Sequence, residues 1–353
     1  MTDTAIAGGL VCPVPTTRYD RVQLGHGSGG KMSAALLREH FLPHFRGEAL
    51  NMLGDGAVVA IAGGNIVVST DTFVVSPLEF PGGNIGSLAV HGTVNDIAMM
   101  GARPLYLSAG FVLEEGLPLD VLDRVVAAMA EAARLAGVEI ITGDTKVVER
   151  GKADGIFINT TGIGIRLPFF TPHASLARPG DSVIVSGPIG RHGIAIMSAR
   201  EGLGFDVEVQ SDSAGLFSLV DRLRGALEGD VHVLRDPTRG GLASALNEIA
   251  AASRVGVVLD EDTLPVPGPV HAACEMLGLD PLYVANEGIF VAFVPAALED
   301  DAVDALRLHP QGRAARRIGH VVADHPGMVV MRTASGGTRV VDMLPGDQLP
   351  RIC

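Results

Sequence analysis

The sequence predicts a two-domain α/β protein (α/β or α+β), on the basis of three observations. The chain of 353 residues is long enough for about two domains of ordinary size. It contains 45 glycines and no tryptophan, and only 4% of its residues are aromatic, so a core of small and β-branched side chains is expected. Helical and β-rich segments alternate in both halves, which is typical of a mixed α/β fold.

The first half begins with an irregular arm over residues 1–20, where Pro13 and Pro15 interrupt any period. A helix is expected from Lys31 to the residue before Pro43. The other expected elements of this half are a hairpin of strands 57–62 and 66–70, helices 85–100 and 119–136, and strands 139–142 and 156–166 on either side of a GDTK segment.

Prolines and Gly180 interrupt the pattern between residues 167 and 180, which predicts a domain boundary. We therefore expect three parts after the arm: an N-terminal domain over residues 21–168, a C-terminal domain over 169–341 and a flexible tail over 342–353. The expected elements of the second domain are strand 182–186, a helix from about 191, a helix over 242–253, and strands 255–260 and 288–294.

Charge and cysteine content exclude several classes of protein. The net charge of −13 argues against nucleic-acid binding, which requires a basic surface. The cysteines Cys12, Cys274 and Cys353 form no C-x-x-C pair, so neither a disulfide framework nor a zinc ribbon is predicted, and a cytoplasmic protein is expected. The sequence shows no leader pattern and no run of about 18 apolar residues, so we expect no membrane span.

A glycine-rich segment, HGSGGK, precedes the first expected helix and would offer unencumbered amides and one ammonium group to a polyphosphate. The residues of this segment that we assign to a nucleotide are Gly27, Ser28, Gly29, Gly30 and Lys31. The segment is not a Walker A motif, and by itself it is more typical of a structural glycine turn.

Four aspartates follow or interrupt apolar stretches, where an unpaired carboxylate is costly to desolvate. They are Asp55 in GDGA, Asp71 in STDT, Asp96 in VNDIA and Asp144 in GDTK. Any one of them is more typical of a turn or a helix cap, but the set indicates divalent cations. Mg²⁺ prefers oxygen ligands and bridges carboxylates to phosphates, so the set predicts one or two Mg²⁺ ions on a nucleotide.

Neighbouring residues extend this predicted site. Thr72 and Thr145 follow two of the aspartates and are assigned to the nucleotide, and Asn95 adds a neutral ligand. Lys146 would place a positive charge near a transferred phosphoryl group. In the second half, DPTRGGL begins a helix, and NEG places Glu287 before a strand, where it is either a general base or an ordinary surface residue.

The chain ends with Cys353 on the segment DMLPGDQLPRIC. Its prolines and glycine break helical and strand periods, so the segment is interpreted as a flexible arm rather than as core. A thiol on such an arm can be presented to two different sites. We interpret Cys353 as the chemical handle of the protein, and the alternative is a free surface thiol.

Taken together, HGSGGK, GDGA, STDT, VNDIAMMGARP, GDTK, DPTRGGL, NEG and the terminal PRIC resemble the HypE family of hydrogenase maturation proteins, the carbamoyl dehydratases. The resemblance covers the chain from about residue 21 to residue 353. This family is similar to the larger PurM-like superfamily of aminoimidazole ribonucleotide synthetase and selenophosphate synthetase. The aspartates and the glycine segment indicate an ATP-using member, and the tail narrows the resemblance to one family.

The resemblance implies a barrel-like homodimer formed by strands of the N-terminal domain, with ATP and Mg²⁺ between the two domains. It also implies that Cys353 accepts a carbamoyl group from the carbamoyltransferase HypF and becomes a thiocyanate in an ATP-dependent dehydration. Cyanide then passes to iron on the HypC–HypD complex. Within this scheme Glu287 is the expected base and Lys146 the electrostatic stabiliser, and His26 and His91 are further proton carriers.

Two other hypotheses stay open. In the first, the chain is a small-molecule kinase or synthetase of the same superfamily, similar to selenophosphate synthetase, and Cys353 is incidental. The position of Cys12 well upstream of the glycine segment weakens this hypothesis. In the second, the chain is a nucleotide-switched binding module whose LPRIC tail docks into a partner without chemistry.

Overall fold

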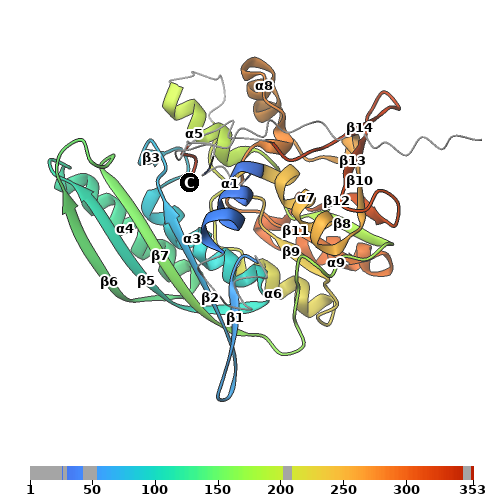
Figure 1. Cartoon of the computed structure of the whole chain (residues 1–353), viewed down its shortest axis with the longest axis horizontal. Coiled ribbons are helices and arrows are strands. Elements are labelled where there is room, and N and C mark those ends of the chain that lie inside the picture. The colour runs from blue at the N-terminus through green and yellow to red at the C-terminus, as the bar shows by residue number, and fades with distance from the viewer. Residues whose placement is uncertain (1–25, 27–29, 43–53, 202–208, 345–350) are drawn as a thin grey trace, which may run out of the picture.

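The computed structural model describes residues 26, 30–42, 54–201, 209–344 and 351–353. Within these residues the strands form a five-stranded sheet, a seven-stranded sheet and a short two-stranded hairpin (Figure 1). The five-stranded sheet precedes residue 167 in the sequence, and the seven-stranded sheet follows residue 180. This mixed architecture confirms the predicted α/β class, whereas the domain limits stay a prediction.

The five-stranded sheet has the order β1-β2-β7-β5-β6, in which only β5 and β6 are parallel neighbours. The bounds are β1 Ala57–Ile61, β2 Gly64–Phe73, β5 Ala102–Glu114, β6 Glu139–Val148 and β7 Ile156–Arg166. Helices α3 (Ile85–Met99) and α4 (Leu119–Ala136) lie on one face of the sheet (Figure 1). Within one chain the sheet is open, and no closed barrel is formed by the described strands.

Helix α3 packs unusually close to its neighbours, as its many small residues predict. A Cβ atom built on Gly86 would lie 2.2 Å from the carbonyl oxygen of Val125 in α4. On the sheet side, a Cβ atom built on Gly162 would lie 2.5 Å from Cδ1 of Ile97. These glycines therefore allow α3 to lie between the sheet and α4. The helix begins after the hairpin of β3 (Glu79–Phe80) and β4 (Gly83–Asn84), and Asn84 caps it.

The seven-stranded sheet has the order β14-β13-β10-β12-β8-β11-β9, and only β10 and β13 are parallel neighbours. The bounds are β8 Asp181–Val185, β9 Val233–Arg235, β10 Gly256–Asp260, β11 Val291–Pro295, β12 Arg316–Val322, β13 Val329–Arg332 and β14 Thr338–Val340. The helices of this half are α5 Arg191–Glu201, α6 Phe217–Ala226, α7 Gly241–Ser253, α8 Gly268–Leu277 and α9 Glu299–Arg307.

Both faces of this second sheet are covered. In β8, Val183 and Val185 pack in the apolar cluster that contains α7, and Ile184 packs in the cluster that contains α6 and α9. Successive residues of a strand point to opposite faces, so a strand covered on both sides is apolar throughout. All five residues of β8 are accordingly buried.

Short helical segments complete the described chain. They are α1 Lys31–Leu36, the π-helix η2 Leu37–Phe41, and the 3₁₀-helices η3 Glu261–Thr263, η4 Pro281–Tyr283, η5 Ala296–Leu298 and η6 Pro310–Gly312. Together, α1 and η2 confirm the helix expected from Lys31. Over the described ranges, no helix combines the length and apolarity that crossing a membrane requires.

Two expectations for the first half are wrong. The GDTK segment was expected between strands, but it lies inside β6, because Gly143 packs against the backbone of β5 rather than forming a turn. A Cβ atom there would lie 2.3 Å from the carbonyl oxygen of Ala109. In addition, β5 is a 13-residue strand in the interior of the sheet, and no strand was expected over residues 102–114.

Candidate functional site

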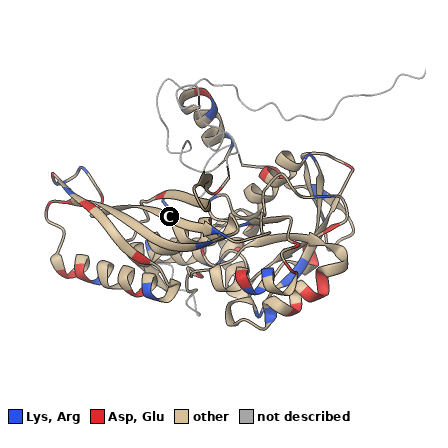
Figure 2. Cartoon of the chain, turned by 90° about the horizontal axis from the view of Figure 1, so that it is seen from below, with Lys and Arg blue, Asp and Glu red and all other residues tan. Residues whose placement is uncertain are grey.

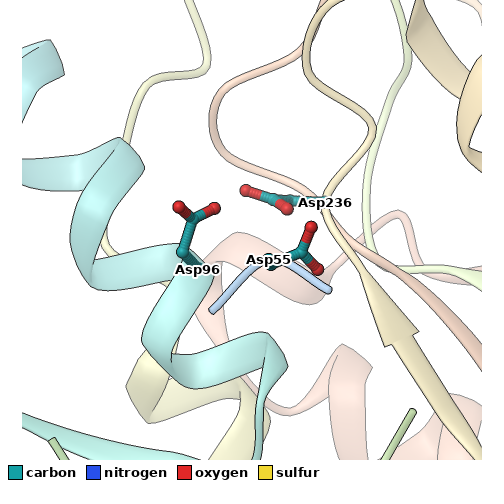
Figure 3. Close-up of side chains that lie close together, drawn as sticks. All are labelled: Asp55, Asp96 and Asp236. Carbon is teal, nitrogen blue, oxygen red and sulfur yellow. The ribbon is translucent and has the colours of Figure 1, made fainter. Parts of the chain in front are cut away.

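Three carboxylates meet between the two halves of the chain. Asp55 lies just before β1, Asp96 is on α3, and Asp236 follows β9. One oxygen from each lies within 4.8 Å of the others, and the three side chains point into the same space (Figure 3). We call this group the carboxylate cluster. It contains two of the four aspartates singled out in the sequence and one that was not.

Burial makes this cluster electrostatically costly when all three groups are ionised. Burial, opposed by Arg235 and assisted by Glu248, raises the pKa of Asp55 to about 6. Burial and the neighbouring Asp55, opposed by Arg235, raise the pKa of Asp236 to about 7. The pKa of Asp96 is raised well above its ordinary value by burial, with Asp236 and Asp55 as the next causes. At neutral pH the three groups are therefore ionised together only when positive charge compensates them.

Part of that positive charge comes from Arg235. Its Nη1 atom lies 2.6 Å from Oδ1 of Asp55, and its Nη2 atom lies 2.7 Å from Oε2 of Glu248. On the other side, Ser69 donates a hydrogen bond to Oδ2 of Asp96 at 2.6 Å. The carboxylate and hydroxyl oxygens of this group are the ligands that a hard divalent cation such as Mg²⁺ prefers, and Arg235 offsets part of their negative charge.

Asp71 lies on β2 beside this cluster. Burial raises its pKa, and the positive charge of Arg239 opposes the shift. Its carboxylate in turn raises the pKa of both Asp96 and Asp236. The structure therefore brings Asp55, Asp71 and Asp96 into one electrostatic group, as the sequence predicts.

A cavity of about 290 Å³ adjoins the cluster. Its lining includes His26, Ser33, Arg235, Asp236, Thr238 and Arg239. Ser244 at the same cavity has a buried hydroxyl oxygen with no hydrogen-bond partner in the structure. Two guanidinium groups, hydroxyls and carboxylates around one hollow are suited to a phosphate-bearing ligand with its cation.

The structure does not bring Asp144, Thr145 and Lys146 to this group within one chain. Asp144 pairs with Gly110, and the same row of the sheet continues through Asn159 to Thr72. Three strand spacings of about 4.8 Å separate Asp144 from Thr72, about 14 Å in all. Adjacent residues point to opposite faces, so Asp144 points to the open face, whereas Asp71 points towards α3.

On that open face Asp144 is exposed and its Oδ2 atom lies 2.5 Å from Nζ of Lys146. This ammonium group and the amide of Thr145 lower the pKa of Asp144. The expectation that four aspartates share one site therefore does not hold inside a single chain. The one-dimensional pattern shows that these carboxylates are unusual, but not which face of the sheet each one occupies.

Other predicted ligands have different surroundings. Asn95 is buried, donates to the carbonyl oxygen of Ala214 at 3.0 Å and accepts from the amide of Leu216 at 2.8 Å, so its amide holds a loop. Thr72 accepts a hydrogen bond from Asn159 at 2.9 Å. Lys31 forms an ion pair of 2.7 Å with Asp342 at the start of the tail. Gly30 is buried at the start of α1, whereas Gly27, Ser28 and Gly29 lie outside the described residues, as does Cys12.

Glu287 is a buried carboxyl group, only 2% exposed, so the alternative of an ordinary surface residue is wrong. Burial raises its pKa well above the ordinary value, and nearby Asp236, Asp71 and Asp212 raise it further. Its Oε1 atom has no hydrogen-bond partner in the structure. A buried carboxyl group with an unsatisfied oxygen beside a charged cavity is a strong candidate for proton transfer.

The tail ends in the core rather than clear of it. Ile352 is 1% exposed and Cys353 is 8% exposed, and both belong to the apolar cluster that joins the five-stranded sheet, α3 and α4 to α5 and α8. The amide of Val74 donates to the main-chain oxygen of Cys353 at 3.1 Å. Val74 is three residues beyond Asp71, which corresponds to about 10 Å along an extended chain. The terminal thiol is thus buried beside the end of the strand that bears Asp71, and the expectation that the tail avoids the core is wrong for these two residues.

Comparison with known proteins agrees with this geometry. The N-terminal domain of AIR synthase related proteins matches residues 53–166, and the C-terminal domain of the same family matches residues 178–331. These matches, with the two sheets and the carboxylate cluster between them, define a two-domain AIR synthase related protein. More narrowly, the chain belongs to the carbamoyl dehydratase HypE family, as the following relatives show.

Carbamoyl dehydratase HypE of Cupriavidus necator is 57% identical over 334 residues, which cover 94% of this chain and 95% of that protein. The Escherichia coli protein of the same name is 45% identical over 339 residues, covering 95% of this chain and 100% of that protein. The chain in a crystal structure of hydrogenase maturation protein HypE in complex with ATP is 51% identical in sequence and has a TM-score of 0.80. The match covers 94% of this chain and 100% of that chain.

The matching chain in a crystal structure of a HypE–HypF complex has a TM-score of 0.83 and 46% identity, covering 88% of this chain and 100% of that chain. Thiamine monophosphate kinase from Aquifex aeolicus is 19% identical with a TM-score of 0.57, covering 76% of this chain and 88% of that chain. At that identity the likeness shows a shared fold alone. The resemblance inferred from the sequence is confirmed at the level of the family.

Sequence reasoning missed two buried acids of this region. Asp236 belongs to the DPTRGGL motif, which was noticed only as a helix start, although its aspartate directly follows an apolar strand like the four that were chosen. Asp212 accepts hydrogen bonds from the amides of Glu287 and Gly288, and burial raises its pKa to about 6. The sequence around Asp212 carries no comparable signal.

Proposed function

We propose that this chain is an ATP-dependent carbamoyl dehydratase of [NiFe]-hydrogenase maturation that acts on its own C-terminal cysteine. The observation that carries the proposal is the burial of Cys353 beside the strand that bears Asp71. A thiol that served only as a surface group would have no reason to lie in the core near a carboxylate cluster. The family membership and the ATP complex of a relative support the same conclusion.

The reaction explains why ATP is needed. The carbamoyl thioester of Cys353 carries a primary amide, and its conversion to a thiocyanate requires loss of the carbonyl oxygen and two protons. Oxide is a very poor leaving group, whereas phosphorylation of that oxygen allows it to depart as inorganic phosphate. The thiocyanate, ADP and phosphate together account for all atoms of the reactants. Positioning and charge stabilisation are the main contributions of a protein to such a phosphoryl transfer.

Each described residue of the site has a role in this scheme. Asp55, Asp71, Asp96 and Asp236 would hold Mg²⁺, which supplies charge neutralisation for the phosphates when bound. Arg239 and Thr238 face the adjoining cavity and are placed to bind phosphate oxygens. Gly27, Ser28, Gly29, Gly30 and Lys31 are retained as proposed nucleotide-binding residues.

Glu287 is the proposed base that accepts protons from the amide. Its buried position beside other acids favours the protonated form, so neutralisation of the cluster by a cation would help to ionise it. His91 is a weaker candidate, because burial lowers its pKa to about 4 and its Nδ1 atom is hydrogen-bonded to Ser213 at 3.0 Å. Asn95 helps to fix the backbone at Glu287, because its side-chain amide nitrogen donates to the carbonyl oxygen of Glu287 at 3.4 Å.

The open face of the five-stranded sheet supports the proposal of a homodimer. The exposed apolar side chains of this face are Val59, Ile61, Tyr106, Ile163 and Ile165. Figure 2 shows that acidic and basic residues gather on helices and at strand ends, while the middle of the strands is largely uncharged. Such a face is typical of a protein interface. In a dimer through this face, Asp144, Thr145 and Lys146 would contribute to catalysis across the interface.

We further propose the partners and the location that the family implies. HypF is the carbamoyl donor, in agreement with the complex formed by a relative. The HypC–HypD complex is the proposed acceptor of cyanide, and the cytoplasm is the proposed location. The tail, over residues 342–353, would carry the loaded sulfur between the partners and the buried position seen here.

Mass spectrometry of the intact chain tests the proposal directly. The purified protein is incubated with the carbamoyl-donating partner, and ATP with Mg²⁺ is then added. The expected result is a gain of one carbamoyl group on Cys353 followed by the loss of one water molecule. Cys353→Ser should abolish both changes, and Glu287→Gln should allow the first and slow the second by roughly 10²- to 10⁴-fold.

The same experiment separates the alternatives. If Cys353→Ser leaves ATP turnover unchanged with a free small-molecule substrate, the chain is a kinase or synthetase of the superfamily. If the mass never changes in the presence of donor and ATP, only a binding role is left. Either result would overturn the proposed dehydratase.

A further inference from the structure

The end of the tail is held by a set of hydrogen bonds to its backbone. The amides of Val74 and Ser76 donate to the main-chain oxygens of Cys353 and Arg351, at 3.1 and 3.2 Å. This pairing runs antiparallel, as when a peptide adds to an exposed strand. The side chain of Arg351 also binds this segment, because its Nε atom donates to the carbonyl oxygen of Val74 at 3.1 Å. Its guanidinium forms an ion pair with Asp154.

His192 on α5 supplies a side-chain contact to the same segment. Its Nε2 atom lies 2.9 Å from the carbonyl oxygen of Ile352, and its Nδ1 atom lies 2.8 Å from the hydroxyl oxygen of Ser211. A carbonyl oxygen only accepts, so Nε2 carries the proton and Nδ1 accepts from Ser211. The ring is fully buried, and burial lowers its pKa to about 4, so it is neutral and holds this tautomer at physiological pH.

Arg200, also on α5, contacts the tail one residue earlier. Its Nη2 atom donates to the carbonyl oxygen of Arg351 at 2.8 Å and to that of Ser76 at 2.7 Å. The guanidinium thus joins the tail to the segment that follows β2. We call His192 and Arg200 the tail clamp.

The clamp is connected to the proposed base through one short loop. Ser211, which bonds His192, is followed by Asp212, whose carboxylate accepts from the amides of Glu287 and Gly288 at 3.3 and 3.1 Å. A second connection runs through α5 itself, because the amide of Gly193 donates to the carbonyl oxygen of Ala285 at 3.0 Å. The residues that hold the tail and the residue proposed to remove its protons are therefore fixed to the same backbone.

The clamp holds the tail through its main chain. Its hydrogen bonds go to the main-chain oxygens of the last three residues, and both Ile352 and Cys353 pack in the apolar cluster. A thiol, a carbamoyl thioester and a thiocyanate all present the same backbone. The same clamp can therefore hold every chemical state of the tail.

We infer that His192 and Arg200 are positioning residues that dock the tail by its backbone and set the sulfur of Cys353 in register with Glu287. The inference rests on the proposed function for its role in catalysis, but the docking itself does not depend on carbamoyl chemistry. A docked tail shields Cys353 from reagents in solution. The clamp is thus measurable in the unloaded protein, in the absence of nucleotide and donor.

Alkylation of the full-length chain by iodoacetamide tests the clamp, with the modified cysteines identified by mass after digestion. His192→Leu is expected to raise the alkylation rate of Cys353 by roughly 5- to 30-fold, the effect of losing one hydrogen bond to a buried carbonyl group. Cys274 on α8 is 2% exposed and belongs to the same apolar cluster as Cys353, so in the same sample it reports whether a variant has loosened that cluster as a whole. Its rate should stay unchanged.

Three further variants make the test specific. His192→Gln keeps a donor near the Nε2 position and should restore most of the protection. Arg200→Met should expose Cys353 by itself. The matched controls are His232→Gln, a buried histidine that bonds Asp181, and Arg224→Met, which pairs with Asp221 on α6, and neither should change the rate.

An unchanged rate at Cys353 in both His192→Leu and Arg200→Met would overturn the clamp. If His192→Leu also exposes Cys274, that variant has loosened the fold. The alkylation rates of Cys353 in Arg200→Met and His192→Gln then decide whether the clamp holds the tail. With donor and ATP present, His192→Leu should slow dehydration of the loaded tail while ATP affinity stays the same. Protection that depends on the clamp in a protein that never becomes carbamoylated would support the docking and refute the proposed function.

Discussion

The carboxylate cluster should make the folding stability of the metal-free protein fall as the pH rises. We consider Asp236→Asn, which removes one ionisable group and nearly preserves its shape. The pKa of Asp236 is raised from 3.8 to about 7 by burial and by neighbouring acids. A carboxyl group with a raised pKa in the folded state favours folding while it is protonated. Its contribution is complete below pH 4 and is lost as the pH rises through 7.

The size of the effect follows from the shift. Each pKa unit corresponds to about 1.4 kcal/mol, so the change at Asp236 is worth about 4 kcal/mol between pH 4 and pH 8. For a chain of this length, that energy corresponds to about 5 °C in the melting temperature. The wild-type protein in EDTA should therefore lose stability between pH 4 and pH 8, and Asp236→Asn should lose about 5 °C less.

Thermal unfolding of the full chain, followed at several pH values with EDTA or with Mg²⁺, measures this effect. Mg²⁺ should restore the melting temperature of the wild type at pH 8 and should do so much less in Asp236→Asn. Asp324→Asn, an exposed change of the same charge, is the control for net charge. Parallel pH profiles for the wild type and Asp236→Asn in EDTA would refute the electrostatic account of the cluster.

Two further predictions concern the loop behind the base and the open sheet face. In Gly288→Ala the new Cβ atom would lie 1.7 Å from the carbonyl oxygen of Asp212, so the adjacent proposed base, Glu287, is displaced. Single-turnover dehydration should then fall by about 100-fold or more. A rate within a few-fold of the wild-type rate would contradict this geometry. Ile165→Glu, on the open face, should shift the protein to monomers in sedimentation velocity, whereas Leu119→Glu, exposed on α4, should not. Equal sedimentation of wild type and Ile165→Glu would place the dimer contact elsewhere.

Several elements were predictable because their signals are local. The helix over residues 119–136 was expected with both of its observed bounds, since its apolar face repeats with the helical period and Gly137 ends it with a left-handed backbone. The β1–β2 hairpin was recognised from its glycine turn, which is occupied in the structure by Gly63 and Gly64 with positive φ.

The predictions that were wrong or incomplete concern residues whose role depends on neighbours distant in the sequence. Gly143 was placed between two expected strands, but its lack of a side chain allows the close approach of β5, about 35 residues away in the sequence. Asp144 was grouped with other aspartates because its motif is similar, whereas sheet register places it on the opposite face. Asp236 and Asp96 meet only when two sheets, folded from separate halves, are brought together. The prolines of the tail predicted an irregular path, but they lie outside the described residues, and they could not reveal where Ile352 packs.

In the proposed reaction the acceptor sulfur is covalently attached to its own enzyme, which changes how that reaction should be described kinetically. A tethered reactant has a local concentration fixed by the tether, so no Michaelis constant for it exists, and dilution does not slow its return to the site. The proposed thiocyanate would not diffuse away, because it would leave the buried position only as part of the chain. The turnover rate would then be set by how fast partner proteins load and unload the tail. Each chain would behave as a stoichiometric carrier that also contains the active site.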